Sequence, residues 1–471
     1  MASPLKLVVN FDINKTLIIS DAAGGKDTRE TVNGLLAEYA WGHVANAREA
    51  ATRAGVAGGD GDGGGGGMST AEMCRLGGLG APDAEGNIWV LDSLDPSLTP
   101  PPADVVAAAR PGVPGAAATS YQTYVEGLRK RKLMEKKVQK KLSWSFTERG
   151  HPGFAMRPHF DRLMAALELP APLKPLAAAL SPVFKTGQVF ILPAFYELLL
   201  WLRREGRLAT TGIVLRTFGT DIADVARDLG HFCAGTHPLY PGIAKMDGSP
   251  GTDRDMRLQV SAGCGCFQRH GDGTGADAAG NASGGTHLTL TNDQGTLSVV
   301  DGFRDIYACI LGKLTDGHQT REFRVEGGHG VLGLQDYYPY WRKHRETAET
   351  GKLLLVDDSG LSASDDSDSD PVVHQIFFDD NVELDRAHIV DVRDVTTGAP
   401  IPFAEANGCY IAKADSLLAI ADRNYYIDLV KACEAGFAAR RAVKRGNTGR
   451  EYDCAAAQGI QAAAAPPVAP P

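Results

Sequence analysis

Three positions that could carry out phosphoryl transfer each follow an apolar run of the chain. Asp12 follows LKLVVNF, Thr217 ends GIVLRT, and the pair Asp379–Asp380 follows HQIFF. A carboxylate can attack phosphorus, a hydroxyl can bind the transferring group, and adjacent carboxylates repel each other unless a cation relieves them. These residue types therefore indicate a metal-assisted phosphoryl-transfer site.

The apolar runs themselves predict strands of one α/β sheet. Uninterrupted apolar segments are typical of strands buried on both faces, and helix-forming segments such as 193–206 lie between them. In a parallel sheet the carboxyl ends of the strands meet at one edge, so residues far apart in sequence can converge there. We therefore expect an α/β fold with a mainly parallel central sheet and helices on both faces.

The same three segments resemble motifs of the haloacid-dehalogenase-like (HAD) superfamily. FDINKTL resembles its first motif, Asp-x-Asp-x-Thr after a strand, and IVLRT resembles its second, a strand that ends in Ser or Thr. IFFDDNVELD resembles its fourth motif, an acidic pair followed by another Asp. The resemblance covers about residues 4–48 and 186–440, and it implies a HAD-like, Rossmann-type fold with partly disordered cap insertions.

The resemblance also implies a catalytic role for each matched residue. Asp12 would attack phosphorus and become an aspartyl phosphate. Thr217 would bind the transferring phosphoryl group and act in catalysis, and Thr16 and Asn14 would also lie against the phosphate. A catalytic lysine beside Asp12 is expected, with Lys352 as the first choice and Lys343 as the second.

A magnesium ion is the cofactor that the resemblance implies. Asp12, the backbone carbonyl of Asn14, and Asp379 or Asp380 would bind it, because Mg²⁺ prefers oxygen ligands. The expected activity is that of a phosphoric ester hydrolase or phosphotransferase, acting on a small phosphorylated metabolite or a phosphoprotein.

The first motif departs from the family at Asn14, where the family has the aspartate that protonates the leaving group. An amide cannot transfer protons, and general acid–base help contributes roughly 10²- to 10⁴-fold in rate. We therefore expect a slow enzyme, or one restricted to good leaving groups, unless Asp21 or Asp27 supplies the acid. The alternative is a catalytically impaired HAD-fold binding or regulatory protein.

Composition divides the chain into five segments. Residues 1–48 are expected to form the first part of the core, and 49–118, with GGDGDGGGGG, a low-complexity and mostly disordered insertion. The remaining segments are a helical cap-like insertion at 119–185, the second part of the core at 186–447 with an insertion at about 240–330, and a disordered tail at 448–471.

Charge and hydropathy argue against nucleic-acid and membrane partners. The formal net charge is −9, so RKRKLMEKKVQKK is interpreted as a solvated helix face. The amino terminus lacks a signal-peptide apolar region, and no run approaches the roughly 20 apolar residues of a membrane span. Scattered cysteines fit reduced thiols rather than a zinc site, so we expect a cytoplasmic protein of undetermined oligomeric state.

Overall fold

The run LVVNFD forms β1 (Leu7–Asp12), a strand whose residues are all buried. It belongs to unit 1 of the chain, which combines Met1–Ile19 with Glu168–Pro471, whereas unit 2 is Ser20–Leu167. The computed structural model describes residues 5–20, 25–56, 68–102, 104, 117–260, 264–270, 285–291, 297–315, 329–362 and 372–446.

In the described part of unit 1, the central sheet has eight strands in the order β13-β11-β1-β5-β9-β6-β7-β8. Neighbouring strands pair in parallel from β13 to β6 and antiparallel from β6 to β8. Besides β1, these strands are β5 (Thr211–Thr217), β6 (Cys264–Arg269), β7 (Thr286–Thr291), β8 (Leu297–Asp301), β9 (Val331–Gln335), β11 (His374–Asp379) and β13 (Ile411–Lys413). A separate parallel pair consists of β10 (Lys352–Val356) and β12 (Val390–Asp394).

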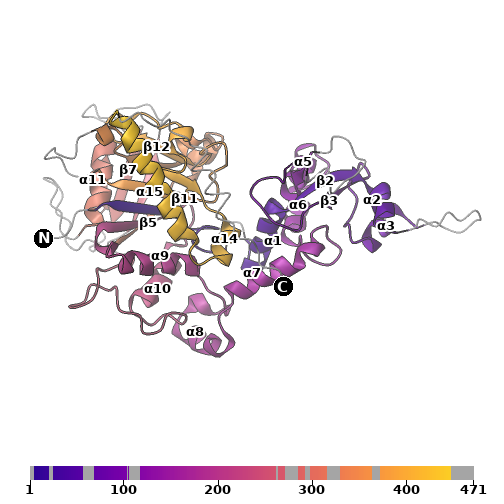
Figure 1. Ribbon diagram of the computed structural model, residues 1–471, viewed down its shortest axis with the longest axis horizontal. Coiled ribbons are helices and arrows are strands. Elements are labelled where there is room, and N and C mark those ends of the chain that lie inside the picture. The colour runs from indigo at the N-terminus through magenta and orange to yellow at the C-terminus, as the bar shows by residue number, and fades with distance from the viewer. Residues whose placement is uncertain are drawn as a thin grey trace, which may run out of the picture. The chain divides into compact units, whose positions relative to one another are not determined.

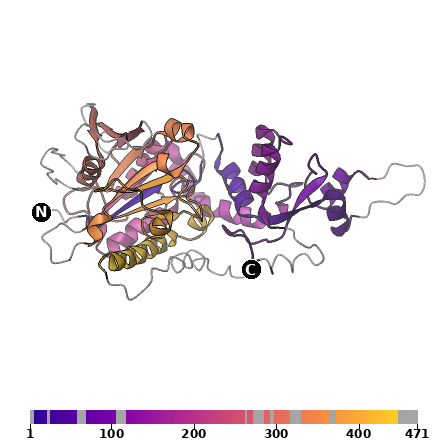
Figure 2. The same cartoon turned by 90° about the horizontal axis from the view of Figure 1, so that it is seen from above.

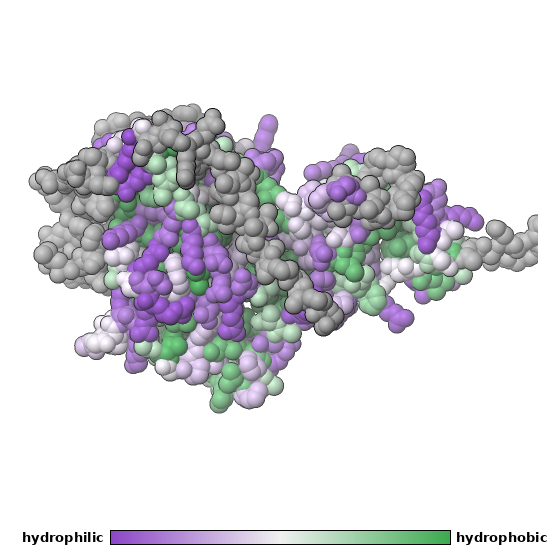
Figure 3. Space-filling model, viewed as in Figure 1, coloured by the Kyte–Doolittle hydropathy of each residue, from purple (hydrophilic) through white to green (hydrophobic). Residues whose placement is uncertain are grey.

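The described helices of unit 1 are α8 (Lys174–Leu180), α9 (Pro193–Arg204), α10 (Ile222–Cys233), α11 (Phe303–Lys313), α12 (Tyr338–Lys343), α13 (Phe403–Ala406), α14 (Ser416–Ala421) and α15 (Tyr425–Lys444). Of these, α9 and α15 pack on one face of the sheet, and α11 packs on the other. Figures 1 and 2 show α15 along one side of the strands. Hydrophilic residues gather on the outer side of this region in Figure 3, as expected for an amphipathic helix with its apolar side on a sheet. The predicted mainly parallel α/β sheet with flanking helices is thus confirmed.

Side chains alternate between the two faces of the sheet along β1, so successive residues contact elements on opposite faces. The ring of Phe11 contacts Phe195 of α9 and Tyr426 of α15 in edge-to-face geometry, with centroids 5.2 and 5.0 Å apart. Val8 faces the other way, into a core that includes Phe303 of α11 and Leu353 of β10. Asp12, four residues after Val8, therefore lies on the β10 side of the sheet.

The described part of unit 2 contains a small antiparallel sheet in the order β3-β2-β4, together with helices. A stacked pair of Tyr121 and Phe146 rings packs against Trp89 in its core. Its elements are α1 (Thr28–Tyr39), β2 (Trp41–Asn46), α2 (Ala47–Arg53), α3 (Thr70–Leu76), β3 (Asn87–Leu91), β4 (Thr119–Ser120), α5 (Tyr121–Lys130), α6 (Lys136–Trp144) and α7 (Arg157–Leu167).

The unit boundaries differ from the segments expected from composition. The first segment of unit 1 ends at Ile19 rather than near residue 48, because α1 packs on α5, α6 and α7 and so belongs to unit 2. Residues 49–118 hold most of α2, with α3 and β3, while GGDGDGGGGG lies outside the described residues. The expected cap-like segment 119–185 is divided at Leu167, so that α8 belongs to unit 1.

Two later segments were also expected to lie apart from the core. The expected insertion at 240–330 instead supplies β6, β7 and β8, which extend the main sheet, because β6 pairs in parallel with β9. The expected tail at 448–471 lies outside the described residues. Among the described helices, none is both long and apolar enough to cross a membrane.

We predict that Phe11→Ala destabilises unit 1 by about 3–5 kcal/mol, because it removes a fully buried ring and its aromatic contacts. Urea denaturation followed by circular dichroism measures the change in free energy of unfolding. The control is Val299→Ala at a side chain that is 59% exposed, where a change within about 0.5 kcal/mol is expected. Equal effects of the two substitutions would contradict the assigned core.

Candidate functional site

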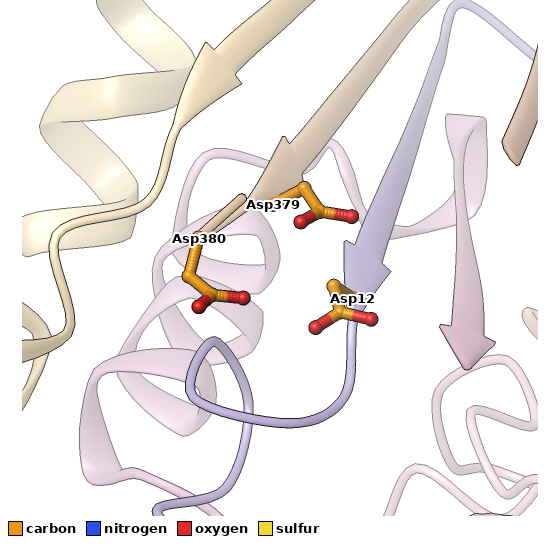
Figure 4. Close-up of side chains that lie close together, drawn as sticks. All are labelled: Asp12, Asp379 and Asp380. Carbon is orange, nitrogen blue, oxygen red and sulfur yellow. The ribbon is translucent and has the colours of Figure 1, made fainter. Parts of the chain in front are cut away.

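Three carboxylates converge at the carboxyl edge of the central sheet. β1 pairs in parallel with β11 on one side and with β5 on the other, so the ends of the three strands lie level. One carboxylate oxygen from each of Asp12, Asp379 and Asp380 lies within 4.8 Å of the others. Figure 4 shows these side chains directed toward the same space. Elsewhere in the described chain, no group of three acidic, histidine or cysteine side chains is this close together.

Lys352 supplies the positive charge of this cluster. It is the first residue of β10, its side chain is buried, and its Nζ donates to Asp12 Oδ1 and, at 2.7 Å, to Asp379 Oδ2. The rings of Phe218 and Phe377 lie 5.2 and 5.7 Å from the ammonium nitrogen. Lysine reaches the carboxylates because β10 lies over the face of the sheet to which Asp12 points.

Burial and charge act in opposite directions on these groups. Burial raises the pKa of Asp12 well above its ordinary value, Lys352 opposes the rise, and Asp379 and Asp380 add to it. Burial alone would lower the pKa of Lys352, but Asp12 and Asp379 outweigh it and raise that pKa. Lys352 is therefore an ammonium ion at neutral pH. This one positive charge balances only part of the negative charge that three ionised carboxylates would carry.

The loop after β1 is held in place by several hydrogen bonds. Lys15 has a left-handed backbone (φ 59°), its carbonyl accepts from Ser416 Oγ at 2.5 Å, and its Nζ lies 3.5 Å from Asp380 Oδ2. Thr16 is buried, and its Oγ1 accepts from the backbone N–H of Asp380 at 3.1 Å. The hydroxyl of Tyr426 donates to the Thr16 carbonyl. Thr16 thus ties the β1 loop to the acidic pair.

Thr217 and Asn14 lie together on the β5 side of the site. Thr217 Oγ1 accepts from the Gly219 backbone N–H at 2.8 Å, which leaves its hydroxyl hydrogen available to another acceptor. Asn14 Nδ2 donates to Asp221 Oδ2 at 3.0 Å. Asn14 Oδ1 is buried and has no hydrogen-bond partner in the described part of the chain. A bound group with an N–H or O–H could satisfy it.

Asp221 was not singled out from the sequence. It precedes α10 as the N-cap residue, yet it makes no side-chain capping bond, and its carboxylate accepts from Asn14 instead. Its position four residues after Thr217, in RTFGTD, is a signal that sequence reasoning could have used.

The remaining candidates lie elsewhere or cannot be placed. Lys343 is exposed at the end of α12, whereas Lys352 contacts Asp12. Asp27 caps α1 of unit 2, where it accepts from the Glu30 backbone N–H at 2.8 Å. Asp21 lies outside the described residues.

The donor set suits a small divalent cation. The convergent atoms are carboxylate oxygens, which hard cations prefer, and two of the three carboxylates are buried where a divalent charge would offset their repulsion. Comparison with models of protein families, with curated proteins and with solved structures gave no match. Inference about function therefore depends on the geometry of this site.

We predict that Mg²⁺ binds more tightly as the pH rises. The raised pKa of Asp12 means that its proton competes with the cation above pH 3.8, the ordinary value for this group, and binding releases that proton. Isothermal titration calorimetry in two buffers of different ionisation enthalpy measures both the affinity and the proton release.

Two variants distinguish Mg²⁺ binding at this site from Mg²⁺ binding to acidic residues elsewhere on the surface. Asp12→Asn should weaken Mg²⁺ binding and abolish the proton release, whereas Asp224→Asn, at an exposed ion pair with Arg227, should change neither. Unchanged binding in Asp12→Asn would place the cation somewhere else.

Proposed function

We propose that this chain is a Mg²⁺-dependent phosphatase or phosphotransferase of the HAD-like superfamily, and that it acts through an aspartyl phosphate on Asp12. The observation that carries the proposal is the meeting of Asp12, Asp379 and Asp380 within 4.8 Å, with Lys352 bonded to two of them. Buried carboxylates that converge beside one ammonium ion are an arrangement suited to binding a cation and a phosphate together.

Asp12, Lys352 and Thr217 each have a separate role in the first step. A carboxylate oxygen of Asp12 attacks phosphorus, and the bond from phosphorus to the ester oxygen breaks with its electron pair going to the leaving group. Lys352 favours the ionised form of Asp12 and offsets charge on the transferring group, while Thr217 donates its hydroxyl hydrogen to a phosphoryl oxygen. In the second step water or an acceptor hydroxyl attacks the same phosphorus, loses its proton, and releases Asp12.

Mg²⁺ would be held by Asp12, by Asp379 or Asp380, and by the backbone carbonyl of Asn14. When bound, it would neutralise charge on the phosphoryl oxygens. Asn14 cannot protonate the leaving group, so the substrate should have one that departs as a stable anion. A small phosphorylated metabolite or a phosphoprotein with a good leaving group meets this condition.

Unit 2 enters the chain where the HAD-like family inserts its substrate-covering caps, directly after the first strand and its loop. The chain leaves unit 1 at Ile19 and returns at Glu168. We therefore assign to unit 2 the role of a cap that contributes to substrate choice.

Hydrolysis of an activated aryl phosphate tests the proposal. With Mg²⁺ the wild-type chain should release phosphate, chelation should stop the reaction, and Asp12→Asn should lower kcat by a factor on the order of 10³ to 10⁶ because the nucleophile is lost. Asp224→Asn serves as a matched control with unchanged activity. Equal rates for Asp12→Asn and the wild type would reject the aspartyl phosphate.

A second candidate, a catalytically impaired binding or regulatory protein, is favoured by one observation. Asn14 stands where the family has its acid, and its amide is already engaged by Asp221. Such a protein would bind Mg²⁺ and phosphate analogues without turnover.

Exchanging the Asn14 and Asp221 side chains distinguishes an enzyme that lacks only its general acid from a binding protein without catalytic activity. Asn14→Asp alone would place two carboxylates about one hydrogen bond apart, so we expect lower thermal stability and little gain in rate. The double variant Asn14→Asp/Asp221→Asn restores a donor and an acceptor, and kcat for poor leaving groups should rise roughly 10²-fold or more above wild type. A double variant as stable as wild type but inert toward every phosphate ester would favour the binding protein.

A further inference from the structure

An open pocket of about 370 Å³ lies beside the candidate site in unit 1. Its walls come from the loop after β5, the first turn of α10, and strands β6, β7 and β9. Gly219, Ala223, Cys266, Thr289 and Gln335 are among the residues that line it. The volume lies in the range of small-molecule sites.

Gly219 is the point where this pocket meets the candidate phosphate-binding residues. A side-chain carbon at position 219 would lie 3.3 Å from Thr217 Oγ1, 3.7 Å from Asn14 Nδ2 and 2.7 Å from Asp221 Oδ2. Gln335 Nε2 donates to the Gly219 carbonyl at 2.9 Å and holds this wall to β9. A side chain at position 219 would displace the Asp221 carboxylate and crowd Thr217, so the backbone of Gly219 is what separates the pocket from the candidate phosphate-binding residues.

Among the residues that the structure describes, none that lines the pocket carries an ionised side chain: aspartate, glutamate, lysine, arginine and histidine are all missing from its described walls. Burial raises the pKa of the Cys264 thiol to about 11, and burial followed by Asp336 raises that of Cys266, so both thiols are neutral at neutral pH. A charged ligand group would lose hydration here without gaining a partner of opposite charge, whereas hydroxyl and amide groups of the wall suit an uncharged one.

We propose that this pocket binds the leaving group of the phosphorylated substrate, and that this leaving group is an uncharged organic group about the size of one substituted ring. The inference rests on the proposed function and narrows its substrate class. It disfavours metabolites whose leaving group carries a carboxylate, a second phosphate or an ammonium ion. Ile222 and Val260 provide apolar contact, and Thr289 and Gln335 provide polar groups.

Two aryl phosphates that differ by one charge test the inference. 4-Nitrophenyl phosphate has an uncharged ring, and 3-carboxy-4-nitrophenyl phosphate adds a carboxylate to a similar nitrophenol leaving group. Steady-state kcat/KM with Mg²⁺ should be at least about tenfold higher for the uncharged ester, mainly through KM, because the carboxylate would be desolvated. Acetyl phosphate, whose leaving group is too small to need the pocket, is assayed in parallel.

Ala223 allows the charge of the pocket to be changed without touching the candidate site. It is exposed on the first turn of α10. Ala223→Lys should shift the ratio of the two kcat/KM values toward the carboxylated ester by about fivefold, as expected for an exposed charge pair. Ala223→Gln, which has similar length and no charge, should keep the wild-type ratio, and neither variant should alter turnover of acetyl phosphate.

The outcomes separate the inference from the proposed function. Equal kcat/KM values for the two esters, or a ratio of these values unchanged by Ala223→Lys, would overturn the assignment of the pocket to the leaving group. In that case, Asp12-dependent turnover of acetyl phosphate would still support phosphoryl transfer. Absence of any Asp12-dependent turnover of acetyl phosphate or the aryl esters would reject both. The expected ratio together with its shift in Ala223→Lys alone supports the assignment.

Discussion

Everything in the candidate site depends on the parallel pairing of β1 with β11 and β5. That pairing places Asp12 level with the end of β11, where Asp379 and Asp380 stand, and it leaves carboxylates buried at one edge of the sheet. Removing carboxylates from water is unfavourable unless they are paired or bind a cation. Lys352 relieves part of this repulsion, so the fold itself favours an ammonium group at this place.

A second buried ion pair keeps Lys352 where the carboxylates need it. Arg216, the residue before Thr217, donates to Asp336 at 3.0 and 2.5 Å and to the backbone carbonyl of Leu353 at 3.0 Å. These bonds join β5, β9 and β10, although β10 does not belong to the central sheet. Because Leu353 directly follows Lys352, the guanidinium fixes the strand that carries the ammonium group. Thr217 and Lys352 are thus both held by neighbours of one buried guanidinium.

The sequence predicted the elements whose signals are local and left out those that depend on tertiary contacts. Apolar runs indicated β1, β5 and β11, and the polar residues at their ends indicated the edge where they meet. Lys352 could be chosen only as a lysine before an apolar run, since β10 reaches Asp12 from outside the sheet. Asp221 was missed because its partner, Asn14, is 207 positions away. The boundary at Ile19 was missed because the helical periodicity of α1 does not reveal which unit buries its apolar face.

The insertion of unit 2 after β1 has a consequence for how the protein is made. β1 is synthesised well before its neighbour β11, which pairs with it through contacts such as Leu7 with His374, more than 360 residues later. At roughly 5–20 residues per second, the ribosome takes on the order of tens of seconds to supply that partner. Unit 2, whose residues are contiguous, can fold during this interval, while the apolar strand LVVNF waits without its sheet. An apolar strand that stays unpaired for this long can aggregate, so the distant pairing of β1 lengthens the stage of synthesis during which the chain is vulnerable.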